Sequence, residues 1–552
     1  MRINMNLQKK HYYLIGIWFI INLIQAAITG LHWDESYYWM YSQTPAWGYF
    51  DHPPMVAFFI RAGYFIFQNE LGVRLMFVVV STITFAIVLN ELNERKDFFF
   101  LVIFILSFPL IHTHIAGFIA IPDIPLVLFT MLFLILYRKF IIRPGVGLSV
   151  LLALCLAAMI YSKYHAFLII GFTVLSNLKL LRNKYFWLTA LLTLVFLAPH
   201  IWWQIDNGLP TFKYHLISRT KPLRMKYFYN HIMNQVLMAG PLTGVLVIWK
   251  FTKVKIQDQF SRTLVFNIIG FFFIFVLLSF KNRIEAHWTA AVIPMLMMLT
   301  YPMIKEDKKA KRWFTRLALP IVVLMILARI YLSVDAIPNF GDIKITFYRR
   351  EAVAKEIKQL AQGKKVGFFN NYAAASNYTF YTGDTAILLS TPQYRYCQYD
   401  LWNEEKYAHG EPVFAVTPGR MNTTNQREWI TGEESGTLNI EEFQPLTGII
   451  LSHNQISQQN NKLLVKVTLS NKTSSTVYTD HVSQPVLVVM QEGKEITATL
   501  LKYADKSAIK PGEHAIITIQ VPVTLFDEDK PFVIYTRSKE NIRGELLAIN
   551  PE

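Results

Sequence analysis

The sequence has few cysteines and few charged residues, and both shortages limit the structural classes to which the protein can belong. Two cysteines occur in 552 residues, Cys155 inside an apolar run and Cys397 far along the chain. Neither a disulfide framework nor a cysteine-based metal site is therefore available. Charged residues make up 17% of the chain and hydrophobic residues 53%. Repeated apolar runs long enough to cross about 30 Å of hydrocarbon predict a polytopic α-helical membrane protein.

The sequence also lacks internal repeats, low-complexity stretches and a small-residue cleavage site after its first apolar run. Solenoid architectures are thereby excluded. The missing cleavage site predicts that the first run is a retained helix that also serves as the insertion signal.

Acidic residues are scarce in the first part of the chain. Residues 1–334 hold 32 Lys and Arg against 13 Asp and Glu, whereas residues 335–552 hold 22 against 25. This change predicts two bodies, a basic membrane half and a slightly acidic tail. Much of the basic excess lies in short loops between apolar runs, which suits membrane topology and anionic lipid better than nucleic acid.

Eleven apolar runs have the length of a spanning helix. With a cytoplasmic N-terminus, the basic loops fall on one side in a consistent alternation. The first loop (31–70), the loop 204–228 and the tail then lie outside. Residues 55–70 are apolar but short and interrupted by Arg61, which predicts an interfacial helix. The eleven runs are 12–30, 71–90, 98–116, 119–137, 146–161, 164–178, 185–203, 229–249, 263–280, 286–304 and 314–334.

The hydrophobic period changes beyond the last run, so we expect three domains. Residues 1–336 form the membrane domain. Residues 337–435 predict a small extracytoplasmic α/β domain, with an amphipathic helix over 346–362 and a buried strand over 365–370. Residues 436–552 contain short alternating strands between turns, which predicts an extracytoplasmic β-sandwich.

The first outer loop concentrates acidic and aromatic residues directly after the first apolar run. Asp34 and Glu35 stand among aromatic side chains that include Tyr37 and Tyr38. A partly dry aromatic setting tends to raise the pKa of a carboxyl and make it a usable proton acceptor. An ordinary interfacial aromatic belt with solvated acids would give the same pattern.

Further ionisable residues favour a functional site. Asp51 and His52 add a carboxylate and a titratable imidazole to the same loop, before two stiffening prolines. Asp123 is a lone acid between two apolar runs, and Lys163 is a lone base between two others. Charges this close to hydrocarbon are usually functional or paired, although a simple loop turn also tolerates them.

Two outer segments carry more positive charge than the outer face of a membrane needs. The first segment contributes Lys281, Arg283, Glu285 and His287. The second, the loop 204–228, contributes Lys213, Arg219, Lys221, Arg224 and Lys226. Such an excess suits an anionic group at the membrane surface, for example the phosphate or diphosphate of a lipid headgroup.

The order of these motifs resembles the ArnT-like membrane glycosyltransferases of the GT-C class, which include the protein O-mannosyltransferases and the lipid A aminoarabinose transferases (glycosyltransferase families 39 and 83). The resemblance covers roughly residues 12–300. A later segment, Arg395–Trp402, also looks like one seen in bacterial members. The motifs are Asp34-Glu35, Gly48-Tyr49-Phe50-Asp51-His52-Pro53-Pro54, Ile121-Pro122-Asp123, Ser162-Lys163-Tyr164, and Trp202-Trp203-Gln204 through Gly208 to Phe212.

The resemblance implies an inverting transfer of a sugar from a polyprenyl-phosphate donor to a lipid, glycan or protein acceptor. The transfer would occur on the outer face of a bacterial cytoplasmic membrane, and we expect a monomer. Asp34 matches the catalytic carboxylate, Asp123 a second active-site acid and Lys163 a phosphate-facing base. Asp51 and His52 stand where relatives carry an acid followed by lysine, so His52 is a departure.

Elementary chemistry supports the same roles. A sugar that leaves a phosphate develops negative charge on that phosphate, which cations stabilise. The candidate cations are Lys163, Lys281, Arg283 and His52, and the candidate catalytic acids are Asp34, Glu35 and Asp123. The other expected site residues are Asp51, Tyr37, Tyr38, Glu285 and His287. No cofactor is required by the sequence. Some relatives bind a divalent metal near these acids, and Asp34, Asp51, His52 and His287 are possible ligands, although their spacing does not demand one.

Two other functions fit a basic protein with many spans. One is a flippase or transporter of lipid-linked saccharides, and the other is a non-catalytic scaffold whose tail binds envelope polysaccharide. Transporters usually show two related halves and broken midplane helices. This sequence shows no such halves and its ionisable residues collect on one face, which favours the transferase.

Overall fold

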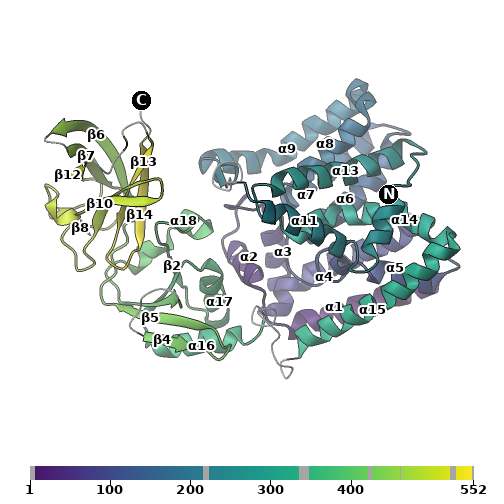
Figure 1. Ribbon diagram of the computed structural model, residues 1–552, viewed down its shortest axis with the longest axis horizontal. Helices are drawn as coiled ribbons and strands as arrows, with labels where there is room; N and C mark the ends of the chain where they lie inside the picture. Colours follow the sequence, from purple (N-terminus) through teal and green to yellow (C-terminus); the bar gives the residue numbers. More distant parts are fainter. Residues whose placement is uncertain are drawn as a thin grey trace. The chain divides into compact units, whose positions relative to one another are not determined.

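The structure is a computed structural model that describes residues 7–214, 223–334, 347–419, 425–459, 462–522, 527 and 530–549. These residues form two compact units, Met1–Tyr348 and Arg349–Glu552. Helices make up the first unit, and strands with a few helices make up the second (Figure 1). Arg219 and Lys221 lie outside the described residues, as does the predicted domain boundary at residue 336.

Long apolar helices dominate the first unit. Their length and composition allow them to cross a membrane, which confirms a polytopic helical membrane protein with a C-terminal β-rich region. In the described part of the chain six segments meet this standard: α1 (Lys9–Ile28), α4 (Glu70–Leu92), α9 (Lys184–Asp206), α13 (Gln259–Ser279), the continuous η4 (Ala286–Val292) and α14 (Ile293–Glu306), and α15 (Lys308–Ser333).

The other predicted runs are also helical, but they are shorter or broken. The unbroken ones are α6 (Asp123–Phe140), α7 (Val146–Ser162) and α8 (Ala166–Ser176), which η2 (Leu178–Arg182) follows. The run 98–116 divides into α5 (Phe98–Leu106) and η1 (Ile111–Ile115) around Pro109, and the run 229–249 divides into α11 (Met225–Met238) and α12 (Gly244–Phe251). Pro241 follows Gly240, whose φ of 121° suits only glycine, so the second break is built into the sequence.

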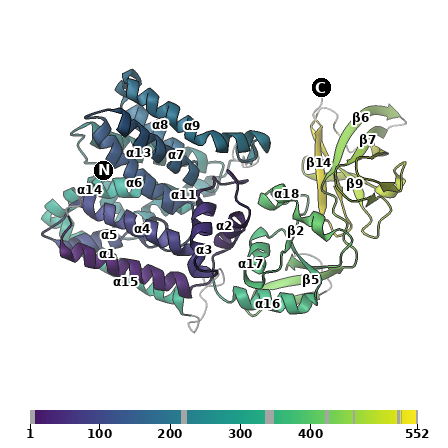
Figure 2. The ribbon, with the colours of Figure 1, turned by 180° about the vertical axis from the view of Figure 1, so that it is seen from behind.

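Polar side chains join the first and last long helices. Figures 1 and 2 show α1 and α15 side by side along one edge of the helical unit. Arg329 Nε on α15 donates to Gln25 Oε1 on α1 at 2.6 Å, and Gln25 Nε2 donates back to the Arg329 carbonyl at 3.2 Å. Buried polar groups paired in this way fix the register of two otherwise apolar surfaces.

The first outer loop folds into two short helices. They are α2 (Trp33–Gln43) and α3 (Met55–Tyr64), and a further short helix, α10 (Pro210–Lys213), follows α9. The expected interfacial helix over 55–70 corresponds to α3 but ends at Tyr64. Its residues Val56, Ala57 and Ile60 are buried, so α3 packs one face into the helical unit.

The second unit begins with an α/β layer. Its five-stranded sheet has the order β2-β1-β3-β5-β4, in which β1, β2 and β3 run parallel and β5 and β4 are antiparallel. Because β5 pairs with β3, this sheet extends past the boundary predicted at residue 435. The elements are α16 (Arg350–Ala361), β1 (Lys365–Phe369), α17 (Tyr372–Thr382), β2 (Ile387–Leu389), α18 (Gln398–Trp402), η5 (Glu404–Ala408), β3 (Val413–Pro418), β4 (Asn425–Glu428) and β5 (Glu434–Ile440).

Antiparallel sheets complete the second unit. Alternate residues such as Val465, Val467 and Leu469 point into a shared core, as their period of two predicts. One sheet holds β6 (Ile449–Gln459), β7 (Lys462–Asn471) and β12 (His514–Pro522), and another holds β9 (Val486–Gln491), β10 (Lys494–Leu500), β13 (Phe532–Arg537) and β14 (Arg543–Ile549). The pair β8 (Val477–Tyr478) and β11 (Ala508–Ile509) and the turn η6 (Leu501–Tyr503) complete the unit.

Candidate active site

Asp34 lies in the first turn of α2 and remains accessible. His32 caps the helix: its Nδ1 accepts a hydrogen bond from the Asp34 backbone N–H at 3.2 Å and lies 3.7 Å from Asp34 Oδ2. The Asp34 side chain is 45% exposed. The positive end of the helix dipole stabilises a negative charge at this position. Asp34 is therefore a carboxylate that both an imidazole and an incoming molecule can reach.

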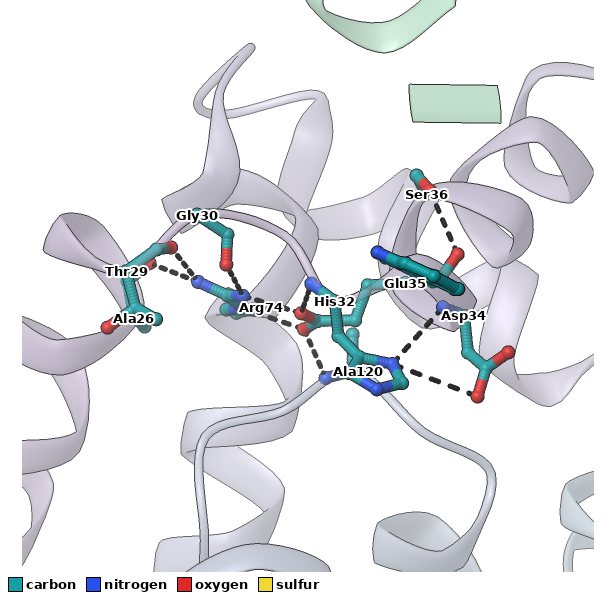
Figure 3. Close-up of polar contacts among 10 residues, drawn as sticks. Ala26, Thr29, Gly30, His32, Asp34, Glu35, Ser36, Arg74 and Ala120 are labelled. Carbon is teal, nitrogen blue, oxygen red and sulfur yellow. Dashed lines mark hydrogen bonds and ion pairs between the residues drawn. The ribbon is translucent and has the colours of Figure 1, made fainter. Parts of the chain in front are cut away.

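Glu35, the adjacent residue, has the opposite environment. Its side chain is fully buried against Arg74 of α4, with Arg74 Nε 2.7 Å from Oε1 and a second guanidinium nitrogen 2.5 Å from Oε2. The backbone N–H groups of Ala120 and His32 add hydrogen bonds of 2.7 and 2.8 Å. Burial raises the pKa of Glu35, but the Arg74 charge and these donors outweigh it, so the pKa lies below its ordinary value. Figure 3 shows the Asp34 carboxylate pointing away from this pair.

The Glu35–Arg74 pair joins segments that are distant in the sequence. The guanidinium also donates to the carbonyls of Ala26, Thr29 and Gly30 at the end of α1 (Figure 3). Glu35 Oε1 also accepts the hydrogen bond from the backbone N–H of Ala120, which lies three positions before Asp123. One buried ion pair thereby fixes the chain on both sides of Asp34 and the segment that leads to Asp123.

The opposite end of α2 holds the second predicted cluster. The Tyr38 hydroxyl lies 3.0 Å from His52 Nε2, and the Tyr41 hydroxyl donates to Asp51 Oδ1 at 2.6 Å. Burial and the Asp51 carboxylate raise the pKa of Tyr41, so its hydroxyl keeps the proton that it donates. Residues 34, 38 and 41 are spaced i, i+4, i+7, which places them on one face of the helix. That face therefore presents Asp34, His52 and Asp51 in succession.

Tyr37 contributes packing to this face. It is buried, and its ring meets that of Tyr41 edge-on at 4.7 Å. Tyr41 in turn stacks on Tyr49, with ring centroids 4.2 Å apart. The aromatic stretch is thus a rigid support behind Asp51 and His52 rather than a belt facing lipid.

Asp123, Lys163 and His287 meet in a second, buried group. Lys163 Nζ donates to both Asp123 carboxylate oxygens, at 2.8 and 2.7 Å, and both side chains are less than 10% exposed. His287 Nε2 lies 4.0 Å from Asp123 Oδ2, and its ring stacks on that of His114 with centroids 4.2 Å apart. Three of the predicted site residues therefore come together from α6, the α7–α8 turn and η4.

The polar face of α2 and the buried Asp123–Lys163–His287 group lie near one another. His32 and His52 both lie close enough to His287 to interact with it electrostatically, and His32 interacts in the same way with His114. His32 is the residue that caps Asp34. The face of α2 therefore lies close to the Asp123 group.

The segment 202–212, another motif of the resemblance, contacts the same loop. Gln204 Nε2 donates to Thr211 Oγ1 at 2.7 Å, and Thr211 Oγ1 donates to the Tyr49 carbonyl at 3.2 Å. His200 Nδ1 lies 2.6 Å from the Trp47 carbonyl. These contacts anchor the far end of the first outer loop to α9.

Lys281, Arg283 and Glu285 do not join the buried group. Lys281 and Arg283 are exposed, and Arg283 pairs with Glu285 at 3.1 Å on the surface. His287 comes from the same segment but reaches the buried group from the helical turn η4, of which it is the second residue. Among the described residues, no group of three or more His, Cys, Asp or Glu side chains is arranged to hold a metal ion.

Arg74, His32 and His114 are not among the site residues predicted from the sequence. Arg74 and His114 each stand inside a predicted apolar run, and an ionisable side chain there is normally paired or functional. That rule would have identified both. His32 precedes the first polar turn and gives no comparable signal.

A comparison with protein-family models supports the resemblance over part of the chain. Residues 51–203 match a family model described as dolichyl-phosphate-mannose-protein mannosyltransferase. No curated protein matches the chain. Among solved structures, the arabinosyltransferase EmbB from Mycobacterium smegmatis aligns with all of this chain and 65% of its own, at 11% identity and a TM-score of 0.44. Residues 51–203, which hold Asp51, His52, Asp123 and Lys163, are therefore similar to the family described as dolichyl-phosphate-mannose-protein mannosyltransferase.

Proposed function

We propose that the chain is an inverting membrane glycosyltransferase that moves a sugar from a polyprenyl-phosphate donor to an acceptor on the outer face of the cytoplasmic membrane. One observation supports this most directly: the accessible Asp34 carboxylate neighbours a buried Asp123–Lys163–His287 group. The first can accept a proton, and the Lys163 ammonium of the second has one N–H donor left for a phosphate oxygen. A single displacement at a glycosyl phosphate needs both.

In the proposed reaction Asp34 takes the proton from the acceptor hydroxyl. The acceptor oxygen forms a bond to the anomeric carbon from the face opposite the phosphate. The bond between that carbon and the phosphate oxygen breaks, and its electron pair leaves with the polyprenyl phosphate. The anomeric configuration is inverted, and no covalent sugar–enzyme intermediate forms.

Lys163 is the proposed contact for the leaving phosphate. An ammonium has three N–H donors, and the two bonds to Asp123 use two of them. The remaining donor suits a phosphate oxygen, while Asp123 orients the lysine. We place His52 beside the donor as well, because it interacts electrostatically with His287 across the site.

The other predicted residues take different roles in this proposal. Glu35 is saturated by four donors and buried, so we assign it a positioning role in place of the catalytic role predicted from the sequence. Lys281 and Arg283 are exposed and attract the phosphate of an approaching donor. Tyr37 and Tyr38 support the loop.

Reconstitution in vesicles tests this function. The full-length chain receives radiolabelled polyprenyl-phosphate hexoses and pentoses, with envelope lipids and glycans as acceptors. We expect time-dependent transfer that falls at least 100-fold in Asp34→Asn, because the general base is lost. Glu70→Gln, a matched removal of a carboxylate from the same outer region, keeps full activity.

The alternatives give different results in the same assay. Movement of labelled lipid across the bilayer without transfer identifies a flippase. Saccharide binding without either identifies a scaffold. Full transfer by a folded Asp34→Asn protein contradicts the assignment of the base.

A further inference from the structure

An open cavity of the helical unit lies at the opposite end of α6 from the candidate active site. Asp123 begins α6, and Arg138, near the end of the same helix, lines the cavity. Because an α-helix rises about 1.5 Å per residue, the two positions are about 22 Å apart along the helix axis. The cavity therefore lies toward the other face of the membrane, which the alternation of basic loops predicts to be cytoplasmic.

The cavity is large enough for the headgroup of a lipid. Its volume is about 440 Å³, and sites for small ligands typically measure about 300–1,000 Å³. The end of α6, the η2 connection between α8 and α9, and the start of α13 line it. Hydrogen bonds join these segments: Asn177 Nδ2 donates to the Tyr137 hydroxyl at 3.2 Å, and Gln259 Nε2 donates to the Ser176 carbonyl at 3.1 Å. The cavity is thus a formed feature of the fold.

Lys179 gives the cavity wall an available positive charge. Its side chain is exposed, and no carboxylate among the described residues forms an ion pair with it. The other cation of the wall, Arg138, is already compensated, because it pairs with Glu91 at 2.7 Å and interacts electrostatically with Asp258. Asp258 in turn caps α13 by accepting the Ser261 backbone N–H at 2.6 Å. The Lys179 ammonium is therefore the group that an incoming anion would meet.

The chain around the cavity is strongly basic. Residues 138–143, 177–184 and 252–262 together hold nine Lys and Arg, and their one acidic residue is Asp258. This charge attracts anions and repels cations over a distance of about a Debye length. Basic loops are common on the cytoplasmic face, but topology alone does not require a cavity between them with an unpaired lysine in its wall.

Exposed apolar side chains beside the cavity favour a lipid over a soluble anion. Ile142 in the wall is 73% exposed, and Leu178 and Leu181 of η2 are 59% and 43% exposed. Lys179 and Arg182 of η2 are exposed as well. Segments that expose both apolar and basic side chains lie at the boundary between hydrocarbon and headgroups. Basic pockets between spanning helices at this boundary suit anionic lipids. We propose that the cavity binds the headgroup of one anionic phospholipid in the leaflet opposite the active site.

Native mass spectrometry of the full-length chain in detergent tests this site. The probes are phosphatidylglycerol, which is anionic, and phosphatidylcholine, which is zwitterionic. We expect one phosphatidylglycerol to bind more tightly than any further copy and about fivefold or more tightly than phosphatidylcholine, and Lys179→Gln to weaken this first site about fivefold. Ile142→Glu, which places an acid at the exposed wall, weakens it as well. Lys309→Gln, which removes an exposed lysine of the same predicted face outside the cavity, leaves the affinity unchanged.

A photoreactive phosphatidylglycerol in vesicles locates the bound lipid. Cross-links to residues 138–142, 177–183 or 258–260 support the site, and cross-links confined to other segments overturn it. Equal affinities for the two lipids, or equal losses in Lys179→Gln and Lys309→Gln, also overturn it. Displacement of the lipid by inorganic phosphate identifies a site for free phosphate instead. Thermal unfolding without added lipid verifies that each variant is folded. Asp34→Asn should lose transfer and keep this binding, so failure of the proposed enzyme activity is distinguishable from failure of the lipid site.

Discussion

At the scale of single residues, Lys163 offers the sharpest test of the donor site. Lys163→Met removes the positive charge, and we expect the KM for the polyprenyl-phosphate donor to rise at least tenfold while the KM for the acceptor changes little. Because the single variant leaves Asp123 buried and unpaired, its stability falls by about 3 kcal/mol or more. The double variant Lys163→Met, Asp123→Asn relieves that penalty and keeps the donor defect. Equal changes in both KM values contradict a phosphate role.

Glu404 predicts a local dependence of stability on pH. Burial raises the pKa of its carboxyl to about 7. Between its ordinary pKa and this value the folded state binds more proton than the unfolded state, so stability is greatest at low pH and is lost as the pH rises through 7. Hydrogen exchange over residues 397–408, corrected for intrinsic rates, should show a loss of about 1–2 kcal/mol from pH 5 to pH 8. Glu404→Gln should show no such slope.

The members of the candidate site could be picked out of the sequence one by one, but the different environments of these residues could not. Asp34, Asp123, Lys163 and His287 stand out in the sequence because ionisable groups beside apolar runs are rare. The family resemblance singles out Asp34, but the local chemistry of the sequence does not separate Asp34 from Glu35, since they are neighbours in the same aromatic stretch. The difference arises from helix geometry, which turns Glu35 toward Arg74 and leaves Asp34 accessible.

At the scale of elements, α2 depends on the Glu35–Arg74 pair for its position. Arg74→Met leaves Glu35 buried without its partner, and we expect faster hydrogen exchange over residues 33–43 and a fall in kcat with a smaller change in donor KM. Arg74→Met combined with Glu35→Gln recovers part of the exchange protection. Unchanged exchange in folded Arg74→Met protein rules out this positioning role.

Helix positions followed from apolar run lengths, whereas helix breaks did not. All eleven predicted runs are helical because length and hydrophobicity alone specify a helix in lipid. The runs 98–116 and 229–249 were predicted as single helices and are each broken in two. Pro109 and the Gly240-Pro241 pair cause these breaks locally, and an average over an apolar window does not register them.

At the scale of the whole molecule, the alternation of basic loops predicts a cytoplasmic N-terminus and an extracytoplasmic second unit. Both native cysteines are buried, so background thiol labelling should be low. In intact cells a membrane-impermeant maleimide should label Ser507→Cys, an exposed position of the second unit. Thr252→Cys, exposed in the α12–α13 loop, should react only after the membrane is permeabilised. Labelling of Thr252→Cys in intact cells, with labelling of Ser507→Cys only after permeabilisation, would contradict the predicted topology.

The Glu35–Arg74 pair also constrains how this protein can evolve. Replacing either residue alone leaves an uncompensated buried charge, whereas replacing both with apolar residues of similar volume is often tolerated in buried pairs. Positions 35 and 74 therefore behave as one heritable unit with sign epistasis, in which each intermediate is less fit than either end state. The position of Asp34, the adjacent residue, is constrained as well, because the Glu35–Arg74 pair fixes the helix α2 that carries it.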